Sequence, residues 1–507
     1  MPKAQSALGQ GILAMGLPKV YEVGGCVRDE LLGKEPKDID LMVCHITAEE
    51  LLAECQKVGK AEQLTVGDQL VGVRLVADFT GPEGVELALA RTEISTGEGH
   101  KDFSIEPIPL PDKLRGKSFQ ERGQDPEIVQ QVLIDLERRD FTCNAVARDL
   151  ETGQTVDPLG GKEDIEQRIL RVVSPNSFRD DPLRILRGLG RISKDQLDPC
   201  PQTDMLARQW AQSISVDPEQ KGALSGERIQ AELDKILSGA DSAKALTLAI
   251  EWGVLQKVLP EFEACVGFDQ QSKYHSLTVD RHTMKALQQA DLMRLSKEEK
   301  LALLLHDIGK PGTAKPGKKG GLMYYAADQS DPTWQTDQQR AKSHQQRGAE
   351  IAEQALTRMA YPKKTIQQVK EMVEGHMFEA ERGFLERPLA RQQLLARKMI
   401  ARHGIETSRS LVRIRICDLA GKAKTSKDFD KDAKALLECL ESQKSNPTSI
   451  SQLAVDGRQL QSLGMKPGPQ IGQALNKLLV IVVGDPAQNS PQRLLSHAQR
   501  LVAASAD

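Results

Sequence analysis

The pattern of apolar residues changes at about residue 164, and this change constrains the fold of the chain most. Before it, runs such as Val20–Val23 and Leu70–Val76 have the length of β-strands, and Ala48–Val58 lies between them with helical spacing. After it, segments such as Arg184–Arg191 place apolar residues three and four positions apart. The sequence therefore predicts an α+β chain, with a small mixed sheet first and helices almost everywhere else.

Length and punctuation predict several domains. At roughly 100–200 residues per domain, 507 residues correspond to three or four domains. The polar stretch Lys422–Asp432, followed by Glu441–Ser449, is the best linker candidate. Residues 111–130 are expected to be a loop or insertion, and Lys310–Gly321 is expected to be a loop. We expect a head over 1–163, a helical neck over 164–265, a helical body over 266–421, and a linker with a helical tail over 422–507.

Composition excludes several classes of protein. The eight cysteines are scattered and form no C-x-x-C pair, which argues against a disulfide framework or a zinc-thiolate site and favours a reducing cytoplasm. No apolar run approaches the ~18–20 residues of a membrane span, so no membrane partner is expected. The net charge is −3, so any RNA binding must come from a local basic surface.

The first candidate site is the stretch Gly24-Gly25-Cys26-Val27-Arg28-Asp29, followed by Asp38-Ile39-Asp40. A Gly-Gly pair between a strand and a helix lets backbone N–H groups approach a triphosphate, and Arg28 can neutralise phosphate charge. Two acids two positions apart in a strand, Asp38 and Asp40, project from one face and suit two Mg²⁺ ions. Glu86 is the candidate third carboxylate. A D-x-D pair alone is more often part of a surface strand, and the upstream Gly-Gly stretch is what favours catalysis.

Two later stretches add arginines. Arg138-Arg139-Asp140 with Asn144 could hold a triphosphate and ribose hydroxyls, or could be a solvated charge cluster at a helix start. In Asp180-Asp181-Pro182 the proline suits a helix first turn, where the acids face the positive end of the helix dipole. Arg184, Arg187 and Arg191 follow on one face of that helix. The alternative is a solvated basic face.

Five of the nine histidines form a set with two aspartates in the second half of the chain. A lone histidine in a helix is usually structural, but an adjacent His-Asp pair followed by Ile-Gly-Lys, with later histidines and an aspartate, favours a metal site. Imidazole and carboxylate ligands suit Mn²⁺, Fe²⁺, Ni²⁺ or Mg²⁺ rather than thiolate-bound zinc. The candidate ligands are His282, His306, Asp307 and Asp418, with His344 and His376 for a second metal or a phosphate, and with His275 as a neighbour.

The motifs GGCVRD…DID, ERRDFTCNA and DDPLRILR closely resemble those of the class II tRNA nucleotidyltransferases and the bacterial poly(A) polymerases. ALARTE and the following ISTGEGHKDF resemble the strand and flexible loop of this family. The resemblance implies a polymerase β-like nucleotidyltransferase head. By residue, it implies nucleotide contacts from Gly25 and Arg28, Mg²⁺ binding by Asp38 and Asp40, triphosphate and ribose contacts from Arg139, Asp140 and Asn144, and base reading by Asp181 and Arg184 with Arg187 in support.

An Asp–Arg pair can select two of the four bases without a template. Cytosine and adenine both present an exocyclic amine beside a ring-nitrogen acceptor, which match a carboxylate and a guanidinium, whereas uracil and guanine have the opposite polarity. The chain departs from the family at one position: where the family usually has a third arginine, this chain has Gly190, which is followed by Arg191. On a helix Arg191 lies about 20° from Arg184, so Arg191 is the candidate to supply the missing charge.

The His-Asp set resembles the HD phosphohydrolase superfamily, and in particular the HD domain fused to some CCA-adding enzymes. This implies phosphatase or cyclic-phosphodiesterase activity on 2′- or 2′,3′-phosphates. The combined expectation is a cytoplasmic enzyme that adds CCA to tRNA from CTP and ATP, with Mg²⁺ in the head and a divalent transition metal or Mg²⁺ in the HD domain. The alternatives are a poly(A) polymerase, a CC- or A-adding relative, or an HD phosphohydrolase whose head only binds RNA.

Overall fold

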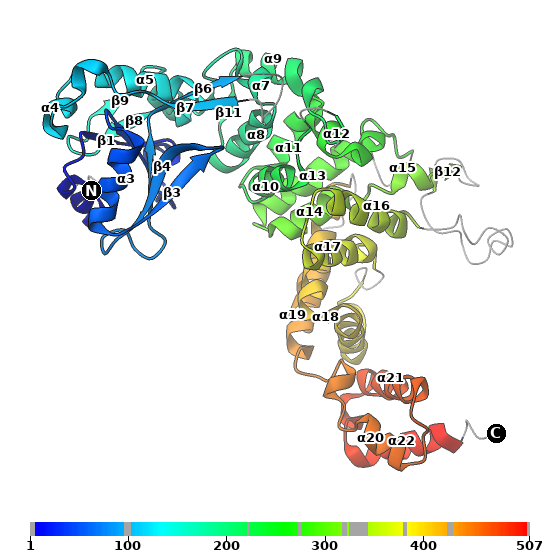
Figure 1. Cartoon of the computed structure of the whole chain (residues 1–507). Helices are drawn as coiled ribbons and strands as arrows, with labels where there is room; N and C mark the ends of the chain where they lie inside the picture. Colours follow the sequence, from blue (N-terminus) through cyan, green and yellow to red (C-terminus); the bar gives the residue numbers. More distant parts are fainter. Residues whose placement is uncertain are drawn as a thin grey trace. The chain divides into compact units, whose positions relative to one another are not determined.

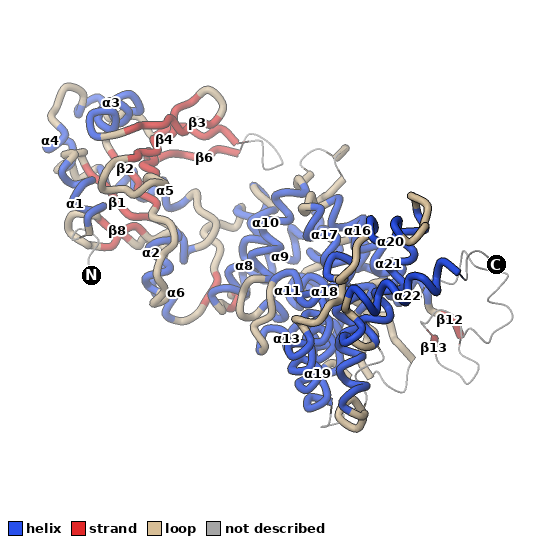
Figure 2. The backbone as a smooth tube through the Cα atoms, turned by 90° about the horizontal axis from the view of Figure 1, so that it is seen from below, coloured by secondary structure: helices blue, strands red, loops and turns tan. Residues whose placement is uncertain are grey.

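The computed structural model describes residues 6–95, 103–217, 219–220, 223–271, 276–316, 322–323, 343–378, 383–422 and 429–503. The chain forms two compact units, Met1–Pro260 and Glu261–Asp507. The main sheet lies in the first unit, and the second unit is mainly helical (Figures 1 and 2). The α+β prediction is therefore confirmed. Among the described residues, no helix is long and apolar enough to span a membrane.

A seven-stranded mixed sheet organises the first unit, in the order β3-β4-β5-β2-β1-β8-β9. At its centre β1 and β2 are antiparallel, whereas β2 and β5 are parallel and place Asp40 beside Glu86. The strands are β1 (Lys19–Val23), β2 (Asp40–Cys44), β3 (Lys60–Val66), β4 (Gln69–Val76), β5 (Val85–Leu89), β8 (Ala147–Asp149) and β9 (Thr155–Val156), with small sheets formed by β6 (Arg91–Ser95) with β7 (Phe103–Pro107) and by β10 (Ile169–Leu170) with β11 (Asp198–Pro199).

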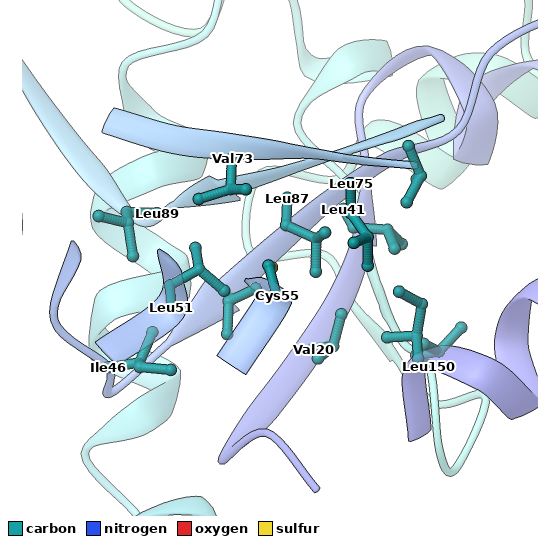
Figure 3. Packing of buried hydrophobic residues seen from close by; sticks show 13 residues of the cluster. Val20, Leu41, Ile46, Leu51, Cys55, Val73, Leu75, Leu87, Leu89 and Leu150 are labelled. Atoms are coloured by element: carbon teal, nitrogen blue, oxygen red, sulfur yellow. The ribbon is translucent and has the colours of Figure 1, made fainter. Parts of the chain in front are cut away.

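Both faces of the sheet are covered, so its central strands are apolar on both sides. On β2, Leu41 and Val43 join one core, which includes Leu51 and Cys55 of α3 (Figure 3). Met42, between them, points into the opposite core together with residues of α5. The helices of the head are α1 (Ala7–Ala14), α2 (Gly25–Leu31), α3 (Ala48–Val58), α4 (Phe119–Gly123), α5 (Ile128–Glu137) and α6 (Gly161–Glu166).

The neck is built around α8, which packs against α10 and α11. Pro182 separates α8 from α7, because the residue before a proline is pushed out of the helical region, and Asp181 has φ −139° and ψ 99°. The helix ends at Gln196, whose φ is 56°. The neck helices are α7 (Ser177–Asp180), α8 (Leu183–Asp195), α9 (Pro201–Trp210), α10 (Gly226–Leu237), α11 (Ser242–Glu251) and α12 (Val254–Val258).

The second unit continues with helices into a small tail of α20, α21 and α22 (Figure 1). Gly404, with φ 74°, interrupts α18. The buried Arg397 of α18 donates to the carbonyl oxygens of Val483 at 2.8 Å and Gly484 at 3.0 Å, which end α21. The elements are α13 (Val279–Leu292), α14 (Lys297–Leu305), α15 (Lys310–Thr313), β12 (Lys315–Pro316), β13 (Leu322–Met323), α16 (His344–Arg358), α17 (Lys363–Gly375), α18 (Leu389–Ala420), α19 (Phe429–Gln443), α20 (Gly457–Ser462), α21 (Pro469–Gly484) and α22 (Pro491–Ala503).

Three local expectations were wrong. Residues 111–130 are not a loop throughout, because Ser118 and Glu121 form a capping box that starts α4, and α5 begins at Ile128. Lys310–Gly321 begins with the helical turn α15. The expected linker Lys422–Asp432 is shorter than predicted, since α19 already begins at Phe429 and buries Leu436 and Leu440.

Candidate functional site

A cavity of about 630 Å³ lies in the first unit, where the ends of central strands meet α2 and α8. It unites acidic, basic and glycine residues from five separate stretches of the sequence. The predicted residues that line it are Gly25, Arg28, Asp40, Glu86, Arg139, Asp140, Asn144, Arg184 and Arg187. Arg91, Glu93 and Arg138 also line it, although the sequence interpretation gave them no role.

Asp40 and Glu86 face each other across neighbouring strands, but Asp38 is placed differently from the prediction. Asp38 lies in the bend before β2, outside the strand and outside the cavity lining. Burial raises the pKa of Asp40, Arg139 counteracts this, and the nearby charges of Glu86 and Asp38 raise it further. Glu86 is ion-paired with Arg74 on β4. In the described part of the head, no three acids bring ligand oxygens within 4.8 Å of one another.

The turn between β1 and α2 requires glycine. Gly24 has φ 74°, and a Cβ there would lie 2.7 Å from Nη1 of Arg139. Arg139 is fixed by Asp135, a buried acid of α5 whose Oδ2 accepts from Nη2 at 2.8 Å. Asp135 also binds Arg138 at 2.7 Å. The sequence interpretation missed Asp135, although its spacing of three and four from two arginines on a helix is a recognisable signal.

A chain of polar contacts runs along the floor of the cavity. Arg28 Nη1 donates to Asn144 Oδ1 at 2.5 Å, and Asn144 Nδ2 donates to Asp140 Oδ1 at 2.8 Å. The other oxygen of Asp140 is ion-paired with Arg187 Nη2 at 3.0 Å. Burial acts to raise the pKa of Asp140, but Arg187, Asn144 and Arg184 outweigh it and hold the pKa below its usual value. The acid therefore stays charged and fixes both neighbours.

The proposed base-reading residues are not all in the cavity. Arg184 lines it, donates to the carbonyl of Arg138 at 3.1 Å and lies 3.6 Å from Glu93. Asp181 lies outside the lining, where it accepts from the backbone of Leu183 at 3.1 Å and meets Arg228 at 3.5 Å.

Arg191, the candidate to supply the charge missing at Gly190, lies outside the cavity lining, and its Nη1 is ion-paired with Asp195 at 3.0 Å. In the structure Arg191 therefore binds Asp195 at the far end of α8. The helical angle alone did not reveal that partner.

A second constellation lies in the helical unit, where two groups of side chains share one residue. The ligand atoms of His282, His306, Asp307 and Asp418 lie within 4.8 Å of one another, as do those of Asp307, His344 and His376. All six are buried. They come from α13, the end of α14, α16, the end of α17 and α18. The six predicted positions are thus brought together, while His275 lies outside the described residues.

The hydrogen bonds orient these side chains toward a common centre. Nδ1 of His306 lies 2.6 Å from the carbonyl oxygen of Leu303, and Nδ1 of His376 lies 2.7 Å from that of Val373. A ring held this way presents Nε2 as an electron-pair donor, which is the usual support for a metal-bound histidine. Gly309 permits the close approach of α16, because a Cβ there would lie 2.2 Å from the carbonyl oxygen of His344.

The two aspartates divide their oxygens between the centre and its surroundings. Asp307 has Oδ2 at 3.1 Å from His306 Nε2 and Oδ1 at 3.7 Å from His344 Nε2, so it presents one oxygen to each group. Asp418 has Oδ1 at 2.9 Å from His282, and its Oδ2 is bound by Arg415 and by Lys422 at 3.1 Å.

The charges of this centre favour deprotonated acids. Burial would raise the pKa of Asp307, but His306 and Lys310 hold it well below its usual value. Burial opposes protonation of His306, yet Asp307 and Asp418 raise its pKa to about 9. Anionic acids beside imidazoles form a donor set that fits divalent cations.

Comparison with known proteins identifies the parts of the chain. Residues 20–171 match the family "Poly A polymerase head domain", residues 222–266 match "Probable RNA and SrmB- binding site of polymerase A", and residues 274–418 match "HD domain". The "Multifunctional CCA protein" of Neisseria gonorrhoeae is 36% identical over 296 residues, which are 58% of this chain and 63% of that protein. The protein of the same name from Xanthomonas campestris is 33% identical over 298 residues, with the same two shares of 58% and 63%.

Solved structures share the fold. The CCA-adding enzyme of Bacillus stearothermophilus in complex with CTP has a TM-score of 0.63 at 21% identity, covering 100% of this chain and 99% of that one. The Thermotoga maritima CCA-adding enzyme complexed with tRNA has a TM-score of 0.53 at 18% identity, covering 97% and 95%.

The chain therefore has two sites: an arginine-rich, acidic pocket in the α/β head and a histidine–aspartate centre in the helical body. The head thus resembles the poly(A) polymerase head family and the body resembles the HD family, and the chain is similar to the "Multifunctional CCA protein" relatives over 58% of its length. It spans about 63% of the length of the curated relatives that it matches.

Proposed function

We propose that the chain adds C, C and A to the 3′ end of tRNA, using CTP and ATP, in the cytoplasm. The observation that carries this proposal is the single cavity in which Asp40 and Glu86 meet Arg28, Asn144 and the arginines of α8. Chemistry at a phosphorus centre needs mainly positioning and charge neutralisation, and this cavity supplies both. The relatives named "Multifunctional CCA protein" support the substrate assignment.

The residues of the predicted nucleotidyltransferase site divide the chemical roles in this proposal. Asp38 and Asp40 hold Mg²⁺, with Glu86 as a third acid, and the bound metal would activate the attacking hydroxyl and stabilise the leaving pyrophosphate. Gly25, Arg28 and Arg139 bind the triphosphate, and Asp140 and Asn144 position the ribose. Asp181 and Arg184 read the base, with Arg187 holding Asp140 beside them. Asp38 lies in the bend before β2, outside the cavity lining, and its charge acts on Asp40.

We also propose that the helical body is a phosphohydrolase for 2′-phosphates or 2′,3′-cyclic phosphates. The two His–Asp groups that share Asp307 carry this second function. Mg²⁺ or a divalent transition metal at these groups would supply a hydroxide at neutral pH. Lys310, Arg415 and Lys422 surround the acids and hold them in place. Such an activity would clean an RNA end before nucleotide addition.

The proposed division of labour follows the expected boundaries: a nucleotidyltransferase head over 1–163, a neck over 164–265 that binds base and RNA, the HD domain over 266–421, and a linker with an RNA-binding tail over 422–507. The match of residues 222–266 to an RNA-binding family supports RNA contacts in the neck. The Gly-Pro-rich segment Lys466–Gly472, within which α21 begins at Pro469, is the corresponding candidate in the tail.

End addition on a tRNA that lacks its 3′ CCA tests the proposal. Purified chain with Mg²⁺ receives labelled CTP or ATP, separately and together, and the products are read at single-nucleotide resolution. Two C additions followed by one A, without further growth, are expected. A long A tail, or only CC or only A, would assign the chain to a relative of different specificity. If no nucleotide is added, the phosphohydrolase remains as the function of the chain.

A further inference from the structure

We propose that Asp195 is a positioning residue that fixes Arg28, and through it the triphosphate, to helix α8. This inference rests on the proposed nucleotidyl transfer, in which Arg28 binds phosphate. Asp195 lies at the last residue of α8, outside the cavity, and its side chain is fully buried. No motif in the chain indicated a role for this residue.

The carboxylate of Asp195 contacts three positively charged side chains from two different parts of the first unit. Oδ1 of Asp195 accepts from Lys34 Nζ at 2.8 Å. Oδ2 accepts from Arg191 Nη1 at 3.0 Å and lies 3.5 Å from Arg28 Nε. Lys34 and Arg28 belong to the head, whereas Arg191 and Asp195 are one turn apart on α8. Asp195 is therefore a direct ionic link between the neck helix and the phosphate-binding arginine.

The same helix reaches the cavity floor at a second point, and the contacts close a ring. From α8, Arg187 binds Asp140 at 3.0 Å, Asp140 binds Asn144 at 2.8 Å, and Asn144 binds Arg28 at 2.5 Å. Arg28 returns to α8 through Asp195. Every member of this ring except Asp195 lines the cavity. Position 195 also lies only about 20° around the helix from Arg184, so the ring and the base-reading arginine share one face of α8.

This geometry predicts what Asp195 controls. The Arg28 guanidinium also binds Asp29, through Nε at 2.9 Å and Nη2 at 2.6 Å, and Asn144 through Nη1. These partners belong to the head, so loss of Asp195 would remove the direct contact that holds Arg28 against α8. CTP and ATP carry the same triphosphate, so both should be affected equally, whereas loss of a base-reading residue should change the ratio between them.

The test compares Asp195→Asn with Asp204→Asn. Asp204 is an acid of α9 in the same unit, bound to Arg208 at 2.9 Å and to Trp252 at 2.7 Å, and it lies outside the cavity. For Asp195→Asn we expect KM to rise about tenfold for CTP and for ATP alike, as when one charge-assisted contact is lost, with kcat changed less than about twofold. Asp204→Asn should leave both constants near their wild-type values even where its melting temperature falls.

Removal of the acid alone leaves three cations close together, which can prevent folding. The double variant Asp195→Asn/Arg191→Met removes one of those cations with the acid and keeps Arg28, so it repeats the test in a less charged site. Unchanged KM values in either folded Asp195 variant would overturn the proposal, as would an equal KM increase in Asp204→Asn at equal loss of stability. A selective effect on only one nucleotide would also contradict it.

Binding of CTP with Mg²⁺, measured by calorimetry without tRNA, separates this proposal from the proposed function. If wild type adds no nucleotide but binds CTP, and Asp195→Asn binds it about tenfold more weakly, the proposed function fails and the role of Asp195 stands. If wild type adds CCA and Asp195→Asn binds CTP equally well, the role of Asp195 fails and the function stands.

Discussion

The ring of His282 lies directly against the backbone of Gly421. A Cβ at position 421 would lie 2.5 Å from Nδ1 and 2.7 Å from Cε1 of the imidazole. Gly421 follows α18 three residues after Asp418, whose Oδ1 lies 2.9 Å from the other ring nitrogen. The glycine thus allows the histidine to reach the centre, and it does so with φ −74°, which any residue can adopt. Glycine is required here because a side chain would clash with the ring of His282, and not because of the backbone conformation.

Gly421→Ala should therefore displace His282 and weaken metal binding. We expect reduced metal content and reduced phosphohydrolase activity, with nucleotide addition unchanged. The control is Gly312→Ala in the same unit, where a Cβ would meet nothing within 4 Å. Metal analysis of both purified variants by mass spectrometry checks the prediction. Equal metal content in Gly421→Ala and wild type would show that the ring can move without leaving the centre.

Asp307 should govern both metal groups, because it presents one oxygen to each. Asp307→Asn is expected to lose metal from both groups, whereas His344→Ala should lose it from one only. Chelation of wild type should remove hydrolysis in the same way, and Mn²⁺ or Mg²⁺ should restore it. The measurement is metal bound per chain after equilibrium dialysis. Equal metal loss in the two variants would mean that the groups do not fill separately.

The two activities should separate by mutation. Asp38→Ala with Asp40→Ala should abolish nucleotide addition and spare hydrolysis, since these acids belong to the first unit. His306→Ala with Asp307→Ala should remove hydrolysis alone, since the HD centre lies in the second unit. Both reactions are assayed on each variant, with circular dichroism as the folding control. Loss of both activities in one folded variant would contradict the assignment of two sites.

Two glycines of α8 should respond to alanine in opposite directions. A Cβ at Gly190 would meet only Lys235 Cβ at an ordinary 3.6 Å, so Gly190→Ala should stabilise the chain by about 0.5–1 kcal/mol through its helix propensity. A Cβ at Gly188 would lie 2.8 Å from the ring of Phe141, so Gly188→Ala should destabilise by roughly 1–3 kcal/mol. Denaturant unfolding of the two variants measures both effects.

Acid should weaken the first unit through Asp195. Burial acts to raise its pKa, but Arg191, Lys34 and Arg28 outweigh it and hold the pKa below its ordinary value. The unfolded chain therefore takes up this proton first, and the stabilisation is present above about pH 4 and is lost as the pH falls through the folded pKa. The free energy of unfolding should decline less steeply with acid in Asp195→Asn. Parallel pH profiles for the two proteins would contradict this.

The sequence predicted the elements that depend on local pattern. Strands β1 and β4 and helix α3 lie where apolar periodicity placed them, because these elements are decided by burial over a few residues. The loop prediction for residues 111–130 failed, since a capping box can start a short helix in a polar stretch. Asp38 was predicted to lie in a strand, but that strand begins only at Asp40. An apolar pattern does not define the end of an element to within one or two residues.

Site residues with a motif of their own could be found, and residues that act through another residue could not. The six HD positions could be recognised because each has a side chain that is a typical metal ligand, and the structure brings their ligand atoms together. Asp135 and Asp195 are single acids in ordinary helices, and their role depends on which arginine lies opposite them in space. The pairing of Arg191 with Asp195 could not be predicted for the same reason. A helical wheel shows the face of a residue, but it does not show the partner on that face.

Arg397 recognises the end of α21 through two main-chain carbonyl oxygens rather than through side chains. Such a contact is indifferent to the amino acids at positions 483 and 484, provided that the helix ends there. The junction between α18 and the tail is therefore compatible with wide sequence drift in α21. The same contact would also tolerate replacement of the tail. A different helical tail whose helix ends at the same place could be joined to this body without a change at Arg397.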